Sequence, residues 1–189
     1  MENSMKKINV LIMALTIMWI FISCSRSSEQ ENAKEETVPV VKAAVVWHNF
    51  NEGLKLAGEK RRPIVMDFYA DWCGWCRKME AEVFSDPDVV AKLSNEYVCI
   101  RLHTDKNYDE TIKYKNHVLT KQEFAAMLGV QGLPTVVFLD REGGLITKIP
   151  GYINKSMFLP LLSYIKDECY LKKIPLKDYM EGKTPCNKK

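Results

Sequence analysis

The chain has 189 residues, of which 47% are hydrophobic and 27% charged, and its formal net charge at pH 7 is +3. This length fits one globular domain with extensions rather than two full domains. Because the charge is small and no basic stripe with interleaved aromatic residues is present, the composition argues against a nucleic-acid-binding protein.

Residues 1–23 have the pattern of a targeting segment. Lys6 and Lys7 precede an almost wholly apolar run from residue 8 to residue 22. This run is short for a membrane-spanning helix, which needs about 20 apolar residues. Ser23 and Cys24 follow this run directly. This sequence resembles the lipobox of bacterial lipoproteins, in which the cysteine is lipidated and becomes the N-terminus. The alternative is an uncleaved signal anchor with an incidental cysteine, and both interpretations place the domain outside the cytoplasmic membrane.

Residues 24–37 are mostly polar and charged and include no aromatic residue. Such a segment cannot bury enough surface to offset the entropy of ordering the chain, so we expect a flexible tether. A folded domain is then expected from residue 38 to residue 168.

Hydrophobic periodicity and turn residues predict alternating strands and helices in this domain. The last helix is expected to begin near Ser156, because Pro160 is tolerated only in a first turn. This order, with a hairpin at 140–144, predicts an α/β fold with a mixed central β-sheet flanked by helices. Strands are expected at 45–47, 64–69, 97–102, 136–139 and 145–149, and helices after Asn49 or Asn51, at 77–83, from Ser85 or Asp88 to 93, after Thr120, and at 156–168.

A Cys-x-x-Cys pair, Cys73 and Cys76, follows the apolar strand directly and precedes a run of helix formers. Such a junction places the first sulfur beside the unpaired N–H groups of a helix start, whose dipoles favour the thiolate. The second sulfur lies one helical turn along, so the pair can cycle between dithiol and disulfide. We expect Cys73, first on the turn and the more exposed, to be the nucleophile and Cys76 to be the resolving thiol.

A zinc site is the usual alternative for a Cys-x-x-Cys pair. It needs about four ligands, but the sequence has no second such pair and its histidines, His48, His103 and His117, are scattered. We therefore predict no metal and no cofactor other than the redox-active disulfide Cys73–Cys76.

The chain contains two longer motifs, Asp67-Phe68-Tyr69-Ala70-x-Trp72-Cys73-Gly74-x-Cys76 and Gly132-Leu133-Pro134-Thr135. Both resemble the thioredoxin superfamily, and the resemblance covers roughly residues 45–167. The longer run from Tyr69 to Pro87 is similar to the C-terminal thioredoxin domain of the bacterial disulfide reductase DsbD and to single-domain thioredoxin-like lipoproteins. The resemblance implies a thioredoxin fold with an insertion at about 103–119, which is either a partner-contacting loop or a tolerated surface excursion.

The resemblance also implies roles for three residues outside the cysteine pair. Asp67 would relay a proton to and from Cys76, and its apolar neighbours should raise the pKa of its carboxyl. Pro134 would have a cis peptide bond and expose backbone groups where an extended substrate can pair. Glu80 matches an acid of the DsbD-like domains that would raise the thiol pKa values, or else it is a solvated helix residue.

The same resemblance implies an apolar docking surface around the sulfurs. Trp75 stands where ordinary thioredoxin has a proline, so the redox potential of that protein cannot be assumed here. The residues expected to bind substrate are Tyr69, Trp72, Gly74, Trp75, Leu133 and Gly151.

Residues 169–189 lie beyond a minimal thioredoxin domain. They contain Cys169 and Cys186, which we expect to form a structural disulfide, given an oxidising compartment and the number of cysteines. Cys99, inside a predicted strand, is then left as a buried, reduced thiol.

Together these features predict a lipid-anchored thiol–disulfide oxidoreductase that faces the periplasm in the cell envelope of a Gram-negative-type bacterium. We expect it to reduce disulfides of envelope proteins and to be recharged by a membrane thiol electron donor of DsbD type. A disulfide oxidase or isomerase on the same fold, or a non-catalytic thioredoxin-fold binding module, are the alternatives.

Overall fold

The computed structural model describes residues 44–106 and 110–186, which belong to one compact unit that extends from Val41 to Lys189. The predicted signal segment, Cys24 and the predicted tether lie outside the described residues. Within the described ranges, no helix combines the length and the apolar character that crossing a membrane requires.

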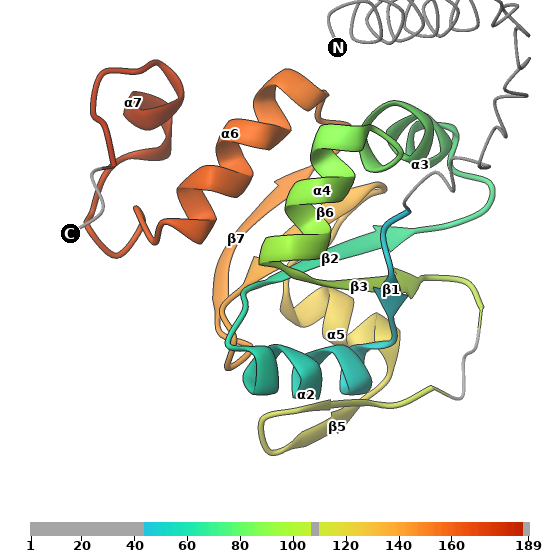
Figure 1. Ribbon diagram of the computed structural model, residues 1–189. Helices are drawn as coiled ribbons and strands as arrows, with labels where there is room; N and C mark the ends of the chain where they lie inside the picture. Colours follow the sequence, from blue (N-terminus) through green and yellow to red (C-terminus); the bar gives the residue numbers. More distant parts are fainter. Residues whose placement is uncertain (1–43, 107–109, 187–189) are drawn as a thin grey trace, which may run out of the picture. The chain divides into compact units, whose positions relative to one another are not determined.

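The centre of the fold is a five-stranded mixed sheet with the strand order β1-β3-β2-β6-β7 (Figure 1). Strand β2 lies in the middle, parallel to β3 and antiparallel to β6. Five of its six residues are buried, because helices cover both faces of the sheet; this explains its nearly continuous apolar sequence. The strands are β1 Trp47–His48, β2 Ile64–Tyr69, β3 Val98–His103, β6 Thr135–Leu139 and β7 Leu145–Pro150.

The sheet divides the hydrophobic core into two clusters. Val65 packs with side chains of α3, α4 and α6, whereas Met66 and Phe68 pack with side chains of α2 and α5, since the alternation of side chains along β2 supplies both faces. The predicted α/β fold class is therefore confirmed. The helices are α2 Phe50–Lys60, α3 Gly74–Met79, which continues into the π-helical turn η2 Glu80–Phe84, α4 Pro87–Glu96, α5 Lys121–Met127 and α6 Lys155–Lys166.

Polar side chains cap the helix starts. Asn49 caps α2, and Thr120 forms a capping box with Glu123 at the start of α5. The prediction for α4 was wrong: Asp86, rather than Ser85 or Asp88, is its cap. The Asp86 side chain accepts hydrogen bonds from two backbone N–H groups of the first turn, and Pro87 follows it at a position where a missing N–H costs nothing.

The last predicted helix also differs from the structure. Asn154 caps it by accepting a hydrogen bond from the Met157 N–H over 3.0 Å, so α6 begins at Lys155 and ends at Lys166. Pro160 consequently lies inside the helix and not in its first turn, contrary to the prediction. The early cap sets the helix start, and burial of the apolar face of α6 offsets the cost of the proline.

The segment predicted as an insertion contains a second, two-stranded sheet, formed by β4 Ile112–Tyr114 and β5 His117–Leu119. Ile112 and Tyr114 are buried, and the ring of Tyr114 lies 5.1 Å from that of Phe124. This hairpin therefore completes one of the two core clusters and is more than a surface excursion.

Beyond α6 the chain carries a short helix, α7 Leu176–Met180. A disulfide joins Cys169, which is fully buried, to Cys186, and the ring of Tyr179 lies 5.2 Å from that of Tyr164 on α6. Both the disulfide and this aromatic contact hold the extension against the domain. Cys99 is buried and free, and burial raises the pKa of its thiol to about 12, which makes it unreactive.

Candidate active site

The two cysteines of the Cys-x-x-Cys pair lie where β2 ends and α3 begins, and they form a disulfide. Cys73 is the N-cap residue of α3, and its sulfur accepts a hydrogen bond from the backbone N–H of Cys76 over 3.1 Å. After reduction, the same N–H would stabilise a thiolate on Cys73. The capping position therefore favours Cys73 as the nucleophile.

One expectation about this pair was wrong. Cys73 is not the more exposed cysteine: it is 4% exposed, compared with 8% for Cys76. Tyr69 and Leu133 pack against the small cluster that the two cysteines form with Ala70, which covers the turn. The distinction between the two sulfurs rests on the helix start, not on solvent access.

Asp67 lies on β2 and is 2% exposed. It shares a cavity of about 310 Å³ with Cys76, so the structure brings together the acid and the second cysteine of the pair. Burial, the largest influence, raises the pKa of the Asp67 carboxyl to about 6. Among the described residues, its Oδ1 has no hydrogen-bond partner. A buried acid with one oxygen available in this cavity is suited to exchange a proton with Cys76.

Arg101 is a residue of this site that the sequence reasoning missed. Its guanidinium donates to Asp67 Oδ2 over 3.1 Å and to Glu80 Oε2 over 2.6 Å, so it bridges the two acids. The charge and hydrogen bond of Arg101 lower the pKa of Asp67 and partly oppose the effect of burial, while Glu80 raises it. The sequence offered one signal, an arginine within a mostly apolar strand, but its pairing in register with Asp67 is visible only in the structure.

The surroundings of Arg101 are aromatic. Its guanidinium lies 4.0 Å from the ring centroid of Trp47 and 4.9 Å from that of Tyr69. These contacts hold the guanidinium over the acids, since a planar cation stacks well on aromatic faces. Glu80 is thereby part of the site through Arg101 and not simply a solvated helix residue.

The second sequence motif meets the first because β6 runs antiparallel to β2. Phe68 pairs with Thr135, so Leu133 and Pro134 lie beside the end of β2. The Leu133–Pro134 peptide bond is cis, and Leu133 packs against the cysteine cluster. Thr135 in turn pairs with Pro150, and the N–H of Gly151 donates to the Pro134 carbonyl over 2.8 Å.

Two exposed tryptophans flank the cysteines. Trp72 is 71% exposed and Trp75 is 58% exposed, which is unusual for side chains this large. The indole N–H of Trp72 donates to the carboxylate of Asp105, and the ring of Trp75 lies 5.7 Å from that of Tyr152. Both rings are held in place yet open to solvent, as a docking surface requires.

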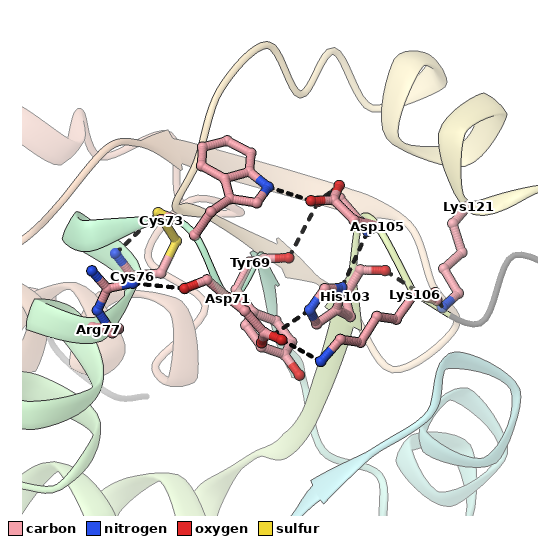
Figure 2. A network of polar contacts seen from close by, with 11 residues as sticks. Tyr69, Asp71, Cys73, Cys76, Arg77, His103, Asp105, Lys106 and Lys121 are labelled. Atoms are coloured by element: carbon pink, nitrogen blue, oxygen red, sulfur yellow. Dashed lines mark hydrogen bonds and ion pairs between the residues drawn. A yellow bond between two sulfur atoms is a disulfide. The ribbon is translucent and has the colours of Figure 1, made fainter.

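A polar network braces the turn before Cys73 (Figure 2). Asp71 contacts Lys106 and lies 3.1 Å from Nε2 of His103, and these two groups, Lys106 first, hold the pKa of the Asp71 carboxyl below its usual value. Arg77, on α3, donates to the Asp71 carbonyl over 2.6 Å. The sequence reasoning had treated His103 only as an isolated histidine; it instead joins the end of β3 to this turn.

Three or more metal-ligating side chains do not gather at any point within residues 44–106 and 110–186. The chemistry that this arrangement supports is thiol–disulfide exchange, with an acid beside the second sulfur and an apolar surface around the first.

Residues 50–166 match the family described as thioredoxin-like domain, which is more than half of the chain. The chain belongs to the thioredoxin-like family. Its Cys-x-x-Cys pair, Cys73 and Cys76, is joined in a disulfide.

Relatives in this family include the thiol:disulfide interchange protein DsbD of Vibrio vulnificus, 30% identical over 143 residues, or 75% of this chain and 22% of that protein. DsbD of Yersinia enterocolitica is 34% identical over 106 residues, or 55% of this chain and 16% of that protein. The chain thus spans about a fifth of the length of these relatives. The resemblance to a DsbD domain predicted from the motifs is confirmed.

Solved structures agree on the fold. A thioredoxin from Thermus thermophilus is 26% identical, with a TM-score of 0.53 over 65% of this chain and 87% of that one. A thioredoxin-fold protein from Helicobacter pylori is 23% identical, with a TM-score of 0.55 over 66% of this chain and 85% of that one. The thioredoxin fold predicted from the sequence is confirmed.

Proposed function

We propose that this protein is a thiol–disulfide oxidoreductase that works as a reductase of protein disulfides. The observation that supports this most directly is the disulfide-forming pair at the start of α3, with Asp67 in the same cavity as Cys76. The similarity to DsbD domains favours the reducing direction. A disulfide oxidase or isomerase would use the same residues, and a non-catalytic binding module would not need Asp67.

The first step is attack by the Cys73 thiolate on one sulfur of a substrate disulfide. The new bond joins Cys73 to the substrate, and the other substrate sulfur leaves as a thiolate and takes up a proton. The Cys76 N–H that now bonds to the sulfur of Cys73 would stabilise the attacking thiolate.

The second step releases the substrate. Asp67, as a carboxylate, takes the proton of the Cys76 thiol, and the Cys76 thiolate attacks the sulfur of Cys73. The Cys73–Cys76 disulfide forms, the substrate leaves with its second thiol, and two electrons have passed to the substrate. Burial raises the proton affinity of Asp67, Arg101 partly offsets this rise, and Glu80 adds to it, so Arg101 and Glu80 act as positioning residues.

The docking surface proposed for the substrate consists of the side chains and glycines around the pair. Trp72 and Trp75 offer exposed rings, and Leu133 lies against the cysteines. An extended chain could pair with backbone groups beside Pro134. The full set is Tyr69, Trp72, Gly74, Trp75, Leu133 and Gly151.

We also propose that Cys24 is lipidated and that the domain faces the periplasm, where a membrane thiol donor of DsbD type would reduce the Cys73–Cys76 disulfide. The lipobox-like sequence before Cys24 supports this. Growth with labelled palmitate should label the wild type but not the Cys24→Ser variant; equal labelling of the two proteins would contradict lipidation at Cys24.

The reduction potential of the Cys73–Cys76 couple tests the proposed direction. Equilibration in dithiothreitol and glutathione buffers should give a value near that of thioredoxin, roughly −270 mV. A value near roughly −120 mV would identify an oxidant instead. If Cys73 and Cys76 showed no reversible redox couple, the non-catalytic binding module would be the supported alternative. The Cys76→Ser variant, which cannot close the disulfide, is the control for other thiols.

A further inference from the structure

An apolar groove lies outside the cysteine site, between α6, α7 and the segment that follows β7. Its volume is about 230 Å³, and none of the side chains that line it is charged. The side chain of its one amide residue, Asn154, is already engaged in capping α6. Met157 of α6 and Met180 of α7 both line the groove, as does Tyr152, which lies between β7 and α6 in the chain.

One residue of the groove, Tyr152, contacts the Cys-x-x-Cys motif. The ring of Tyr152 lies 5.7 Å from that of Trp75, which stands between Cys73 and Cys76. The hydroxyl of Tyr152 donates to Glu82 over 2.6 Å, which fixes the ring next to η2. The Nζ of Lys78 lies 5.2 Å from the centroid of the Trp75 ring and 5.1 Å from that of the Tyr152 ring. The two rings therefore connect the cysteine motif to the groove, with one cation beside them.

The far wall of the groove is held in place before any ligand binds. The disulfide between Cys169 and Cys186 closes the extension at its base, and the hydroxyl of Tyr164 donates to the Ile174 carbonyl over 2.7 Å. A preformed wall lowers the entropy cost of binding. Met157, 51% exposed, adds a flexible side chain that can adapt to different apolar partners.

We propose that this groove holds an apolar stretch of the polypeptide whose cysteine is joined to Cys73 during the reaction. The proposal rests on the proposed function and names its substrate class: disulfide-bonded polypeptides that expose apolar side chains, as incompletely folded proteins do. A charged stretch would lose its hydration against the uncharged side chains that line the groove, so the lining selects against it. The inference adds no covalent step to those given above.

The test compares three disulfides as substrates of the reduced, full-length protein. Two are synthetic peptides that contain the same intramolecular disulfide. In the apolar peptide the disulfide is followed by a tract of Leu, Ile and Phe, and in the polar peptide by a tract of Ser and Gly. The third is oxidised glutathione. We expect a second-order rate constant about tenfold higher for the apolar peptide than for the polar one, as one well-buried contact can provide.

The Met157→Lys variant should lose that advantage of about tenfold and react normally with oxidised glutathione. Met127→Lys is the matched control, because Met127 on α5 is 48% exposed and lies outside the groove; it should behave as wild type. Met157→Leu keeps an apolar side chain and should retain the preference. Equal loss in both lysine variants would overturn the proposal.

Binding of a cysteine-free version of the apolar peptide separates this inference from the proposed function. Met157→Lys should raise its Kd by about tenfold, read from tryptophan fluorescence. An unchanged Kd overturns the groove whether or not disulfides are reduced. If the protein reduced none of the three disulfides but Met157→Lys still raised the Kd, the proposed reductase activity would be refuted. The proposed peptide binding in the groove would still be supported. A wild-type dimer that becomes a monomer on Met157→Lys substitution, with unchanged peptide binding, would show an interface between copies instead.

Discussion

At the scale of single residues, the ionisation of Asp67 is the property on which both stability and catalysis depend. Burial raises the pKa of its carboxyl to about 6, and Arg101 limits the rise. Two consequences follow, one for the free energy of unfolding and one for the proton transfer to Cys76.

The Asp67→Asn variant should reveal the stability cost of this buried acid. Between the ordinary pKa of 3.8 and the folded value of about 6, the native state binds more protons than the unfolded chain. Its stability therefore falls as pH rises through that window, by roughly 3 kcal/mol for a shift of about two units. Urea denaturation of the oxidised proteins should therefore show that the free energy of unfolding of the variant, relative to that of the wild type, increases by this amount between pH 4 and pH 8.

Asp86→Asn provides a control of opposite sign. The pKa of Asp86 is lowered, chiefly by its hydrogen bond with Lys155, so its contribution to stability is present above its ordinary pKa and is lost as pH falls. Asparagine also keeps the cap of α4. A difference between wild type and Asp67→Asn that stays constant with pH would contradict a raised pKa at Asp67.

Arg101→Gln should move the pKa of Asp67 further upward, because it removes the charge and the hydrogen bond that lower it. Carbon NMR of the Asp67 carboxyl gives the titration directly, and the pH midpoint of substrate release should shift in the same direction. At pH 8 the variant should also lose about 2 kcal/mol of stability, since a buried carboxylate loses a charged donor. Arg101→Lys keeps the charge, so its Asp67 pKa should lie between those of the wild type and Arg101→Gln. An unchanged Asp67 pKa in Arg101→Gln would refute the role given to Arg101.

These residues mark the limit of what the sequence could predict. Asp67 and the two cysteines lie in one short motif, where local pattern and family resemblance agree. Arg101 comes from another strand, and its relation to Asp67 depends on the pairing of β2 with β3. The exposure of Cys73 was misjudged because Leu133, distant in sequence, covers the turn. Contacts between distant segments have no local signature.

At the scale of elements, side-chain caps and cross-element hydrogen bonds decide where helices begin and where the inserted hairpin lies. Asn51 had been an alternative cap for α2, but Asn49 takes that position. Asn51 instead binds the hairpin: its Nδ2 donates to the Thr111 carbonyl and its Oδ1 accepts from the Lys113 N–H, each over 2.8 Å. A sequence pattern could place an asparagine near a helix start, but it could not show which distant segment of the chain its side chain would bind.

Asn51→Ala should therefore loosen the hairpin without unfolding the domain. Two hydrogen bonds are lost at an exposed site, which should lower the stability of the hairpin by about 1–2 kcal/mol. Amide hydrogen exchange should quicken at residues 112–119 and stay unchanged in β2. Asn51→Asp keeps the acceptor but loses the donor, so it should give a smaller effect; equal protection in all three proteins would mean that Ile112 and Tyr114 alone anchor the hairpin.

At the scale of the whole described unit, the topology brings three segments to one place. The cysteines follow the carboxyl end of β2, Pro134 directly precedes antiparallel β6, and Gly151 and Tyr152 follow the end of β7. A mixed sheet flanked by helices was expected from the alternation of elements, whereas the strand order comes from the structure. The packing of the C-terminal extension could not be expected, because α7 has five residues and no buried one.

Cys186→Ala should show how far the second disulfide stabilises the whole domain. The bond closes a loop with a sequence separation of 17, and loss of a cross-link of this size costs about 3 kcal/mol where the loop unfolds with the domain. Cys169, which is fully buried, then remains as a small apolar thiol and leaves no cavity. Urea denaturation without reductant measures the loss, and the potential of Cys73–Cys76 should be unchanged.

Loss of the Cys73–Cys76 cross-link in a double alanine variant should cost less, since it closes a much shorter loop. If Cys186→Ala left the denaturation midpoint unaltered, the extension would unfold separately, and the far wall of the groove would not depend on its disulfide.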